Sequence, residues 1–151
     1  MIFLVGGYDK DEPYGRVFEF EIPSRLVPIE KYDQAGGFGI VWGGQKEYTE
    51  RLILGFDNGL INQVKNYLKL DNNKTKELSE HLKKNLTARI PFAFLPLQDC
   101  VDVSIFLIRT TIAIQNWIVG IRGVGGAIDI ATITRTEGFK SIQKKSILGE
   151  K

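Results

Sequence analysis

The most constraining feature of the sequence is a long apolar stretch over residues 97–119, which lies between Pro96 and Gly120. Proline suits the first turn of a helix, and a strand of this length would far exceed the ordinary five or six residues. The polar residues of the stretch are spaced three, seven and seven positions apart, so they share one narrow stripe of a helix. They are Asp99, Asp102, Arg109 and Asn116. The stretch therefore predicts a helix that is buried on most sides, between a sheet and another layer.

Two runs near the N-terminus predict a β-hairpin. Residues 2–5 form a short apolar run that is followed by two glycines, and residues 17–22 alternate between apolar and acidic side chains. The alternation places the aromatic residues on one face and Glu19 and Glu21 on the other. The two runs are therefore expected to pair as a hairpin with one solvated face.

Pro23 and Pro28 are expected to end the hairpin, because proline removes a ladder hydrogen bond. Three segments after the hairpin are expected to be further strands. Residues 36–44 are rich in glycine and predict a strand that another backbone can approach closely. Residues 127–133 and 139–142 predict two C-terminal strands with a turn between them.

The segment between these strands is helical in pattern. Helix-forming residues fill 45–54, and residues 57–59 (Asp-Asn-Gly) are expected to break the helix. Residues 60–68 carry an apolar stripe at helical spacing, and Thr75 is expected to cap a third helix. Three strands, four helices and two strands then follow one another along the chain, which predicts an α+β fold. One domain is expected over residues 1–145, with a tail over residues 146–151.

Composition excludes several classes of function. The net charge of +2 is too small for an obvious nucleic-acid-binding surface. The only cysteine is Cys100 and the only histidine is His81, so neither an intramolecular disulfide nor a zinc site built from these residue types is available. The N-terminal apolar run is shorter than a signal-peptide core, and residues 110–121 fall short of the roughly 18 residues of a membrane helix. We expect a cytoplasmic protein without a cofactor, a metal or a membrane partner.

Isolated polar residues have simple structural explanations. The acidic residues 9–12 lack the glycine of a calcium loop and are expected to form a solvated turn. Asp99 and Asp102 begin the long helix, where they complement its dipole. His81 is expected at the surface of the third helix, and Cys100 is expected to pack as a small core residue.

The glycine-rich loop over residues 120–126 differs from the known phosphate-binding loops. A dinucleotide loop follows a strand and opens a helix, whereas this loop follows a helix and opens a strand. A Walker loop also requires Gly-Lys-Ser/Thr, which the chain lacks. An anion could still bind to a nest of backbone N–H groups here. Its candidate ligands are Arg122, Gly123 and Gly125.

Three motifs in this order resemble the C-terminal half of a proteasome-type β subunit, a member of the N-terminal-nucleophile (Ntn) hydrolases. The first is a strand that ends in Gly6-Gly7 with an acidic turn and a second strand. The second is Trp42-Gly43-Gly44, at the position of a Gly-Ser-Gly-like turn that opens a helix, and the third is a long helix that leads to Gly125-Gly126 and a strand. The resemblance covers residues 2–144. It implies part of a four-layer αββα sandwich.

The resemblance also implies a catalytic site that this chain does not supply. Family members use an N-terminal threonine as nucleophile and its own amine as base, whereas this sequence reads Met1-Ile2. The supporting Asp and Ser before the Gly-Gly pair fall on Ile121 and Val124, and the serine of the turn falls on Gly43. No residue of this chain is therefore predicted to be catalytic, and whether the protein is an enzyme stays open.

Three functional hypotheses follow. The first is a proteasome-like homologue whose peptide or amide hydrolysis would use a nucleophile from outside this chain. The second is a non-catalytic structural or assembly subunit of the same fold. The third is a small-anion-binding α+β domain. Half of a sandwich leaves apolar faces open. We therefore expect that the chain is a fragment of a longer polypeptide, that a second chain supplies the missing half, or that the chain forms a homo-oligomer through the open faces.

Overall fold

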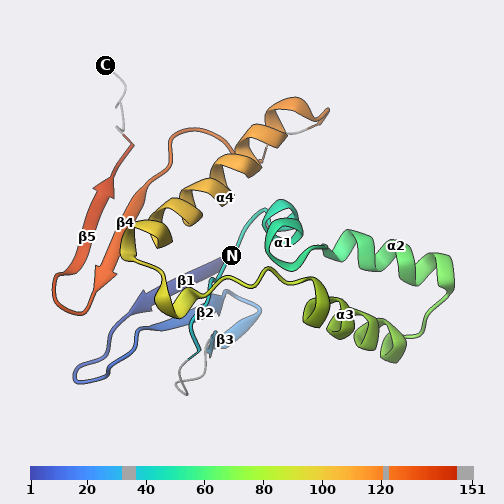
Figure 1. The fold of residues 1–151 in the computed structure, drawn as a ribbon, viewed down its shortest axis with the longest axis horizontal. Coiled ribbons are helices and arrows are strands. Elements are labelled where there is room, and N and C mark those ends of the chain that lie inside the picture. Colours follow the sequence, from blue (N-terminus) through green and yellow to red (C-terminus); the bar gives the residue numbers. More distant parts are fainter. Residues whose placement is uncertain (32–36, 121–122, 146–151) are drawn as a thin grey trace. The chain divides into compact units, whose positions relative to one another are not determined.

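The computed structural model describes residues 1–31, 37–120 and 123–145. It has the expected α+β composition, with antiparallel sheets and α-helices (Figure 1). Its strands are β1 (Ile2–Gly7), β2 (Arg16–Glu21), β3 (Arg25–Glu30), β4 (Ile130–Thr134) and β5 (Gly138–Gln143). Its helices are α1 (Glu47–Leu54), α2 (Asn58–Leu68), α3 (Asn72–Leu86), a short 3-10 turn (Phe92–Phe94) and α4 (Leu97–Trp117).

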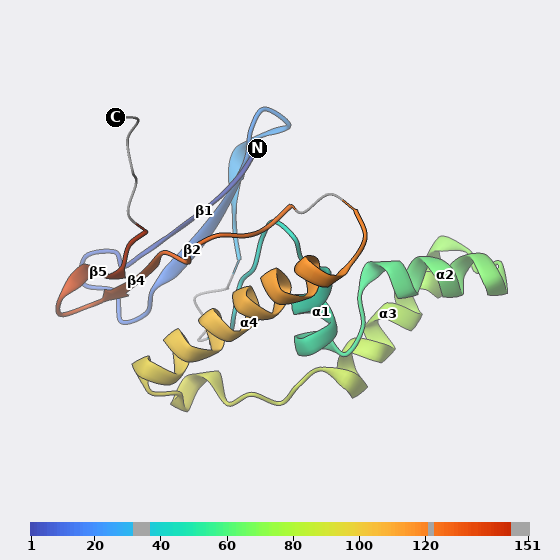
Figure 2. The ribbon, with the colours of Figure 1, turned by 90° about the horizontal axis from the view of Figure 1, so that it is seen from above.

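The chain divides into two compact units. The sheet unit comprises Met1–Gly43, Phe92–Asp102 and Gly126–Lys151, and the helical unit comprises Gly44–Pro91 and Val103–Gly125. Helix α4 begins in the sheet unit and ends in the helical unit. Within the helical unit, α2 and α3 contact one another as two helices joined by a short connection (Figure 2).

The predicted N-terminal hairpin is confirmed. Strands β1 and β2 pair antiparallel, with Phe3 opposite Phe20 and Leu4 opposite Glu19. Residues directly opposite one another share a face, so the aromatic pair lies on one face and Glu19 lies on the other. The predicted separation of aromatic and acidic side chains between the two faces of β2 is therefore confirmed.

The third strand is a different segment from the one predicted. Strand β3 pairs with β2 from Arg25 to Glu30, and Pro28 lies inside it rather than ending the hairpin. An edge strand tolerates proline, because one row of its N–H groups has no ladder partner. The described part of the glycine segment, residues 37–44, forms no strand. Its density of glycine explains this, since glycine weakens strands.

The breaks between the predicted helices are shifted by a few residues. Helix α1 ends at Gly55, which adopts the left-handed conformation (φ 81°) that favours glycine. Asp57 caps α2 through a hydrogen bond from the N–H of Leu60 at 2.9 Å, so Asn58 and Gly59 lie within the first turn of α2 rather than in a break. Helix α3 is likewise capped by Asp71, not by Thr75 as expected, because the carboxylate of Asp71, four residues before Thr75, accepts the N–H of Lys74.

The long apolar segment is a helix, as predicted, but the expectation of burial on most sides is wrong. In α4 the buried residues are Leu107, Thr111 and Gln115, which recur every fourth position and so form one stripe. Phe106 and Trp117 are exposed on other sides of the helix. The described residues therefore cover a single face of α4.

The buried apolar side chains belong to the helical unit. Among the described residues they are Ile53, Phe56, Ile61 and Leu107. In the sheet unit the buried residue among those described is Thr132. The strand residues are otherwise exposed or half-buried.

The C-terminal strands are confirmed as the antiparallel pair β4 and β5, with Ile133 opposite Phe139. The side chain of Gln143 donates to the carbonyl of Ile128 at 2.8 Å, and the N–H of Lys145 donates to Asp129 at 2.7 Å. The second bond lowers the pKa of Asp129. Within the described parts of the chain, no helix is both long and apolar enough to cross a membrane.

Candidate functional site

Within the helical unit, the turn that follows the first glycine segment meets the glycine loop after α4. A Cβ atom placed on Gly123 would lie 2.9 Å from Nε2 of Gln45, so the loop after α4 runs directly against the turn before α1. Gly44 in that turn has a φ of 72°, a conformation that L side chains rarely adopt. Segments that lie about 80 residues apart in the chain are thus neighbours. We call this region the glycine junction, defined by Gly44, Gln45, Gln115, Gly123 and Val124.

Gln115 anchors the loop side of the glycine junction. Its side chain is 5% exposed, and its Oε1 accepts hydrogen bonds from the N–H groups of Gly123 and Val124, both at 2.9 Å. A buried amide needs such partners, because an unsatisfied polar group costs free energy. Two successive N–H groups that converge on one oxygen form the kind of nest that also holds anions. Here the oxygen is supplied by the protein itself.

The structure brings together some of the predicted site residues and not others. Val124 is half-buried at the glycine junction, and the N–H of Gly123 is engaged by Gln115. Gly43 is exposed, with an added Cβ 3.7 Å from Cδ1 of Leu4, and Gly125 is exposed with no atom within 4 Å of an added Cβ. Ile121 and Arg122 lie outside the described residues.

The side chains of the glycine junction can donate and accept hydrogen bonds but cannot carry a proton in catalysis. Glutamine amides are not titratable, and glycine and valine offer no functional group. General acid–base catalysis needs a titratable group, and covalent catalysis needs a hydroxyl, thiol, amine or carboxylate. The described part of the glycine junction therefore orients a loop and holds no reactive group.

Replacing Gln115 by leucine should destabilise the protein by about 1–3 kcal/mol, because two hydrogen bonds to the loop are lost while the apolar volume is retained. Urea unfolding measures the change. Gln63→Leu on the exposed surface of α2 is the control, and it should change stability by less than about 0.5 kcal/mol. Equal effects of the two substitutions would show that Gln115 does not anchor the loop.

A second polar cluster surrounds Asp57 at the start of α2. Its carboxylate is 3% exposed, accepts a hydrogen bond from the N–H of Leu60 and pairs with the guanidinium of Arg51. The hydrogen bond from Arg51 holds the pKa of Asp57 below its ordinary value. An open pocket of about 490 Å³ adjoins these residues and is also lined by Phe56 and Gln63. One oxygen of the carboxylate, Oδ1, accepts the hydrogen bond that caps the helix, and the other, Oδ2, pairs with Arg51. The cluster is therefore structural.

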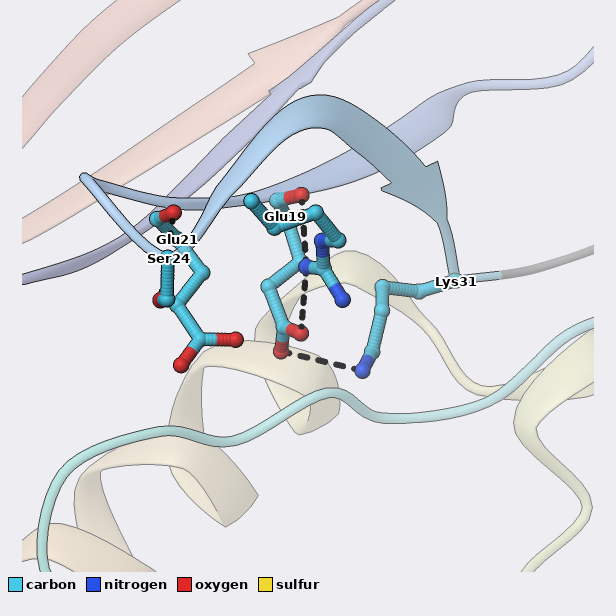
Figure 3. Close-up of polar contacts among 5 residues, drawn as sticks. Glu19, Glu21, Ser24 and Lys31 are labelled. Carbon is cyan, nitrogen blue, oxygen red and sulfur yellow. Dashed lines mark hydrogen bonds and ion pairs between the residues drawn. The ribbon is translucent and has the colours of Figure 1, made fainter.

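A third cluster joins β2 to β3 (Figure 3). Glu19 accepts hydrogen bonds from Lys31 at 3.0 Å and from Arg25 at 3.1 Å, and these bonds lower the pKa of Glu19. Arg16 pairs with Glu30 and with Asp9, each at 2.8 Å, and thereby lowers the pKa of Glu30. Both groups of charges are therefore compensated within the sheet unit, and Asp9 lies in the turn as expected.

The remaining candidates do not gather into a site. His81 is exposed on α3, as predicted for a surface histidine, and Cys100 is half-buried on α4. Over the ranges 1–31, 37–120 and 123–145, no group of three or more His, Cys, Asp or Glu side chains could hold a metal ion.

Sequence reasoning missed the two glutamines of the glycine junction. A signal for Gln115 does exist, because it continues the four-residue spacing of Leu107 and Thr111 on an apolar helix. A polar residue at a core position indicates a buried hydrogen-bond partner. Gln45 carries no comparable signal, since its neighbour at Gly123 is distant in sequence.

The resemblance to Ntn hydrolases is supported by its sequence motifs alone, because comparisons with known proteins gave no match. No protein-family model matches the chain. The searches of curated proteins and of solved structures likewise gave no match.

Proposed function

We propose that this chain is a structural, non-catalytic part of a proteasome-like Ntn-hydrolase assembly, in which any reactive nucleophile comes from outside the chain. The observation that carries the proposal is the glycine junction. The family resemblance assigns both glycine segments to the surroundings of one catalytic centre, and Gln45 and Gly123 lie against one another. Such proximity is what the resemblance requires of these two segments.

The composition of the glycine junction supports a structural role over a catalytic one. Its described residues hold a loop through Gln115 and offer no nucleophile or proton carrier. The position that corresponds to the family's turn serine is Gly43, and the position of the second serine is Val124. At these two positions the chain therefore offers no hydroxyl that could support an attacking group.

The exposed sheets support an assembly role. Phe3 and Val5 are exposed on β1, and Phe139 and Ile142 are exposed on β5. In a four-layer αββα sandwich each sheet packs on a second sheet and on helices, which would cover these side chains. We therefore propose this sandwich as the complete fold, with a partner or a second copy supplying further layers.

A peptide epoxyketone, which captures a nucleophile that carries a free α-amine, tests the absence of catalysis. We expect the intact mass of the chain to stay unchanged after prolonged incubation, with an active Ntn hydrolase in the same tube as the positive control. An adduct that maps to a residue of this chain would overturn the non-catalytic role.

A further inference from the structure

The sheet β1-β2-β3 has two edges of opposite character. Strand β3 forms one edge and carries Pro28 together with the charged residues Arg25 and Glu30. Proline and charge are the devices with which natural sheets prevent further strand pairing. Strand β1 forms the other edge, and its residues Ile2–Gly7 include neither a proline nor a charged side chain. The edge at β1 is therefore the one open to another strand.

The backbone of β1 presents unpaired groups along this edge. Met1 and Ile22 exchange two hydrogen bonds, from the N–H of Ile22 and from the amino group of Met1. Bonded pairs alternate along an antiparallel ladder, so Phe3 also bonds toward β2, whereas Ile2 and Leu4 direct their N–H and C=O groups to the open edge. Among the described residues, none pairs with the backbone of β1 on this side.

The side chains around β1 are apolar on the face that carries Phe3 and Val5. Phe18 and Phe20 lie opposite them on β2 and share that face. The neighbouring charge of Arg16 is compensated by its own ion pairs and lies over the ring of Phe18. An identical surface would therefore meet this one without repulsion between like charges.

We propose that β1 is the edge through which this chain pairs with a second copy of itself, forming a continuous six-stranded antiparallel sheet. The partner must offer an uncharged strand with a free edge, and β1 itself meets that requirement. With Leu4 opposite Leu4, Ile2 of each copy lies opposite Gly6 of the other copy. The backbone groups of these residues that face the open edge then pair across a two-fold axis. The inference rests on the proposed assembly role and names its contact surface.

Two substitutions in the full-length chain test the pairing by sedimentation velocity. Val5→Lys places a charge on the central part of the edge strand, at a side chain that is 53% exposed. Leu4→Pro removes an N–H that points away from β2, so the β1–β2 ladder keeps its bonds. Each should weaken dimerisation by about tenfold or more, because the two copies lose edge hydrogen bonds or gain a repelling pair of charges.

The matched control is Val27→Lys on the opposite edge, where the side chain is 72% exposed. It should leave the dimer unchanged, and circular dichroism should show that all three variants keep the fold. An oligomer that survives both β1 substitutions, or one that Val27→Lys disrupts equally, would overturn the inference but leave the assembly role. A wild-type chain that stays monomeric and folded, with no other partner, would overturn both.

Discussion

Replacing Phe56 by alanine is expected to lower the free energy of unfolding by about 3–5 kcal/mol, the range measured for large aromatic residues in cores. Phe56 is 3% exposed and lies between α1 and α2. Phe56 is one of four buried apolar side chains among the described residues, so its loss removes a large share of the contacts in this small core. Urea unfolding, followed by circular dichroism at 222 nm, measures the loss as a shift of the midpoint.

The matched control is Phe94→Ala, which removes the same side chain from a site that is 86% exposed. It should change stability by less than about 0.5 kcal/mol. A similar loss for both variants would show that the helical core around Phe56 is not the stabilising core of the protein. The contrast between the two phenylalanines therefore tests where the core lies.

Stability should fall on acidification through the titration of Asp57. The hydrogen bond from Arg51 lowers the folded pKa of this carboxyl below its ordinary value of 3.8. A group with a depressed folded pKa contributes stability that is present above its unfolded pKa and is lost as the pH falls through the folded pKa. Asp57→Asn keeps the helix cap and removes the charge, so it should lower the free energy of unfolding by about 1–2 kcal/mol at pH 7. The loss is kept to this range because Arg51 is partly exposed and solvent screens its charge.

The difference between wild type and Asp57→Asn should shrink as the pH falls below 3.8 and should vanish once Asp57 is protonated in the folded state. Urea unfolding at a series of pH values measures it. Glu80→Gln, at an exposed position of α3, is the control and should show no such trend. A difference that stays constant down to acidic pH would mean that the charge of Asp57 contributes nothing.

Local patterns predicted the elements whose stability depends on near neighbours. The alternation over residues 17–22 predicted the face and pairing of β2, and the polar spacing of residues 97–119 predicted α4. Strand β3 was missed because Pro28 argues against a strand, yet the edge position removes that penalty. Whether a strand lies at an edge depends on the other strands and cannot be read from its own residues.

The glycine junction was predictable only in part. The resemblance directed attention to residues 43–44 and 121–126, and the contact lies one residue beyond the first of these segments, between Gln45 and Gly123. The amide of Gln115 holds the loop of the junction, and Gln45 lies against Gly123. Glutamine is common on helix surfaces, so the burial of Gln115 depends on its tertiary contact with Gly123 and Val124. The burial of α4 was overestimated for a related reason, because an apolar side chain is not necessarily a covered one.

The mass of the wild-type chain in solution tests the central claim most directly. The account holds that the exposed apolar strands belong to an interface, so sedimentation equilibrium should give a multiple of 17.0 kDa, or a stable complex with a partner chain. A folded 17.0 kDa monomer that remains monomeric at all accessible concentrations, with a cooperative unfolding transition and no partner, would contradict the account.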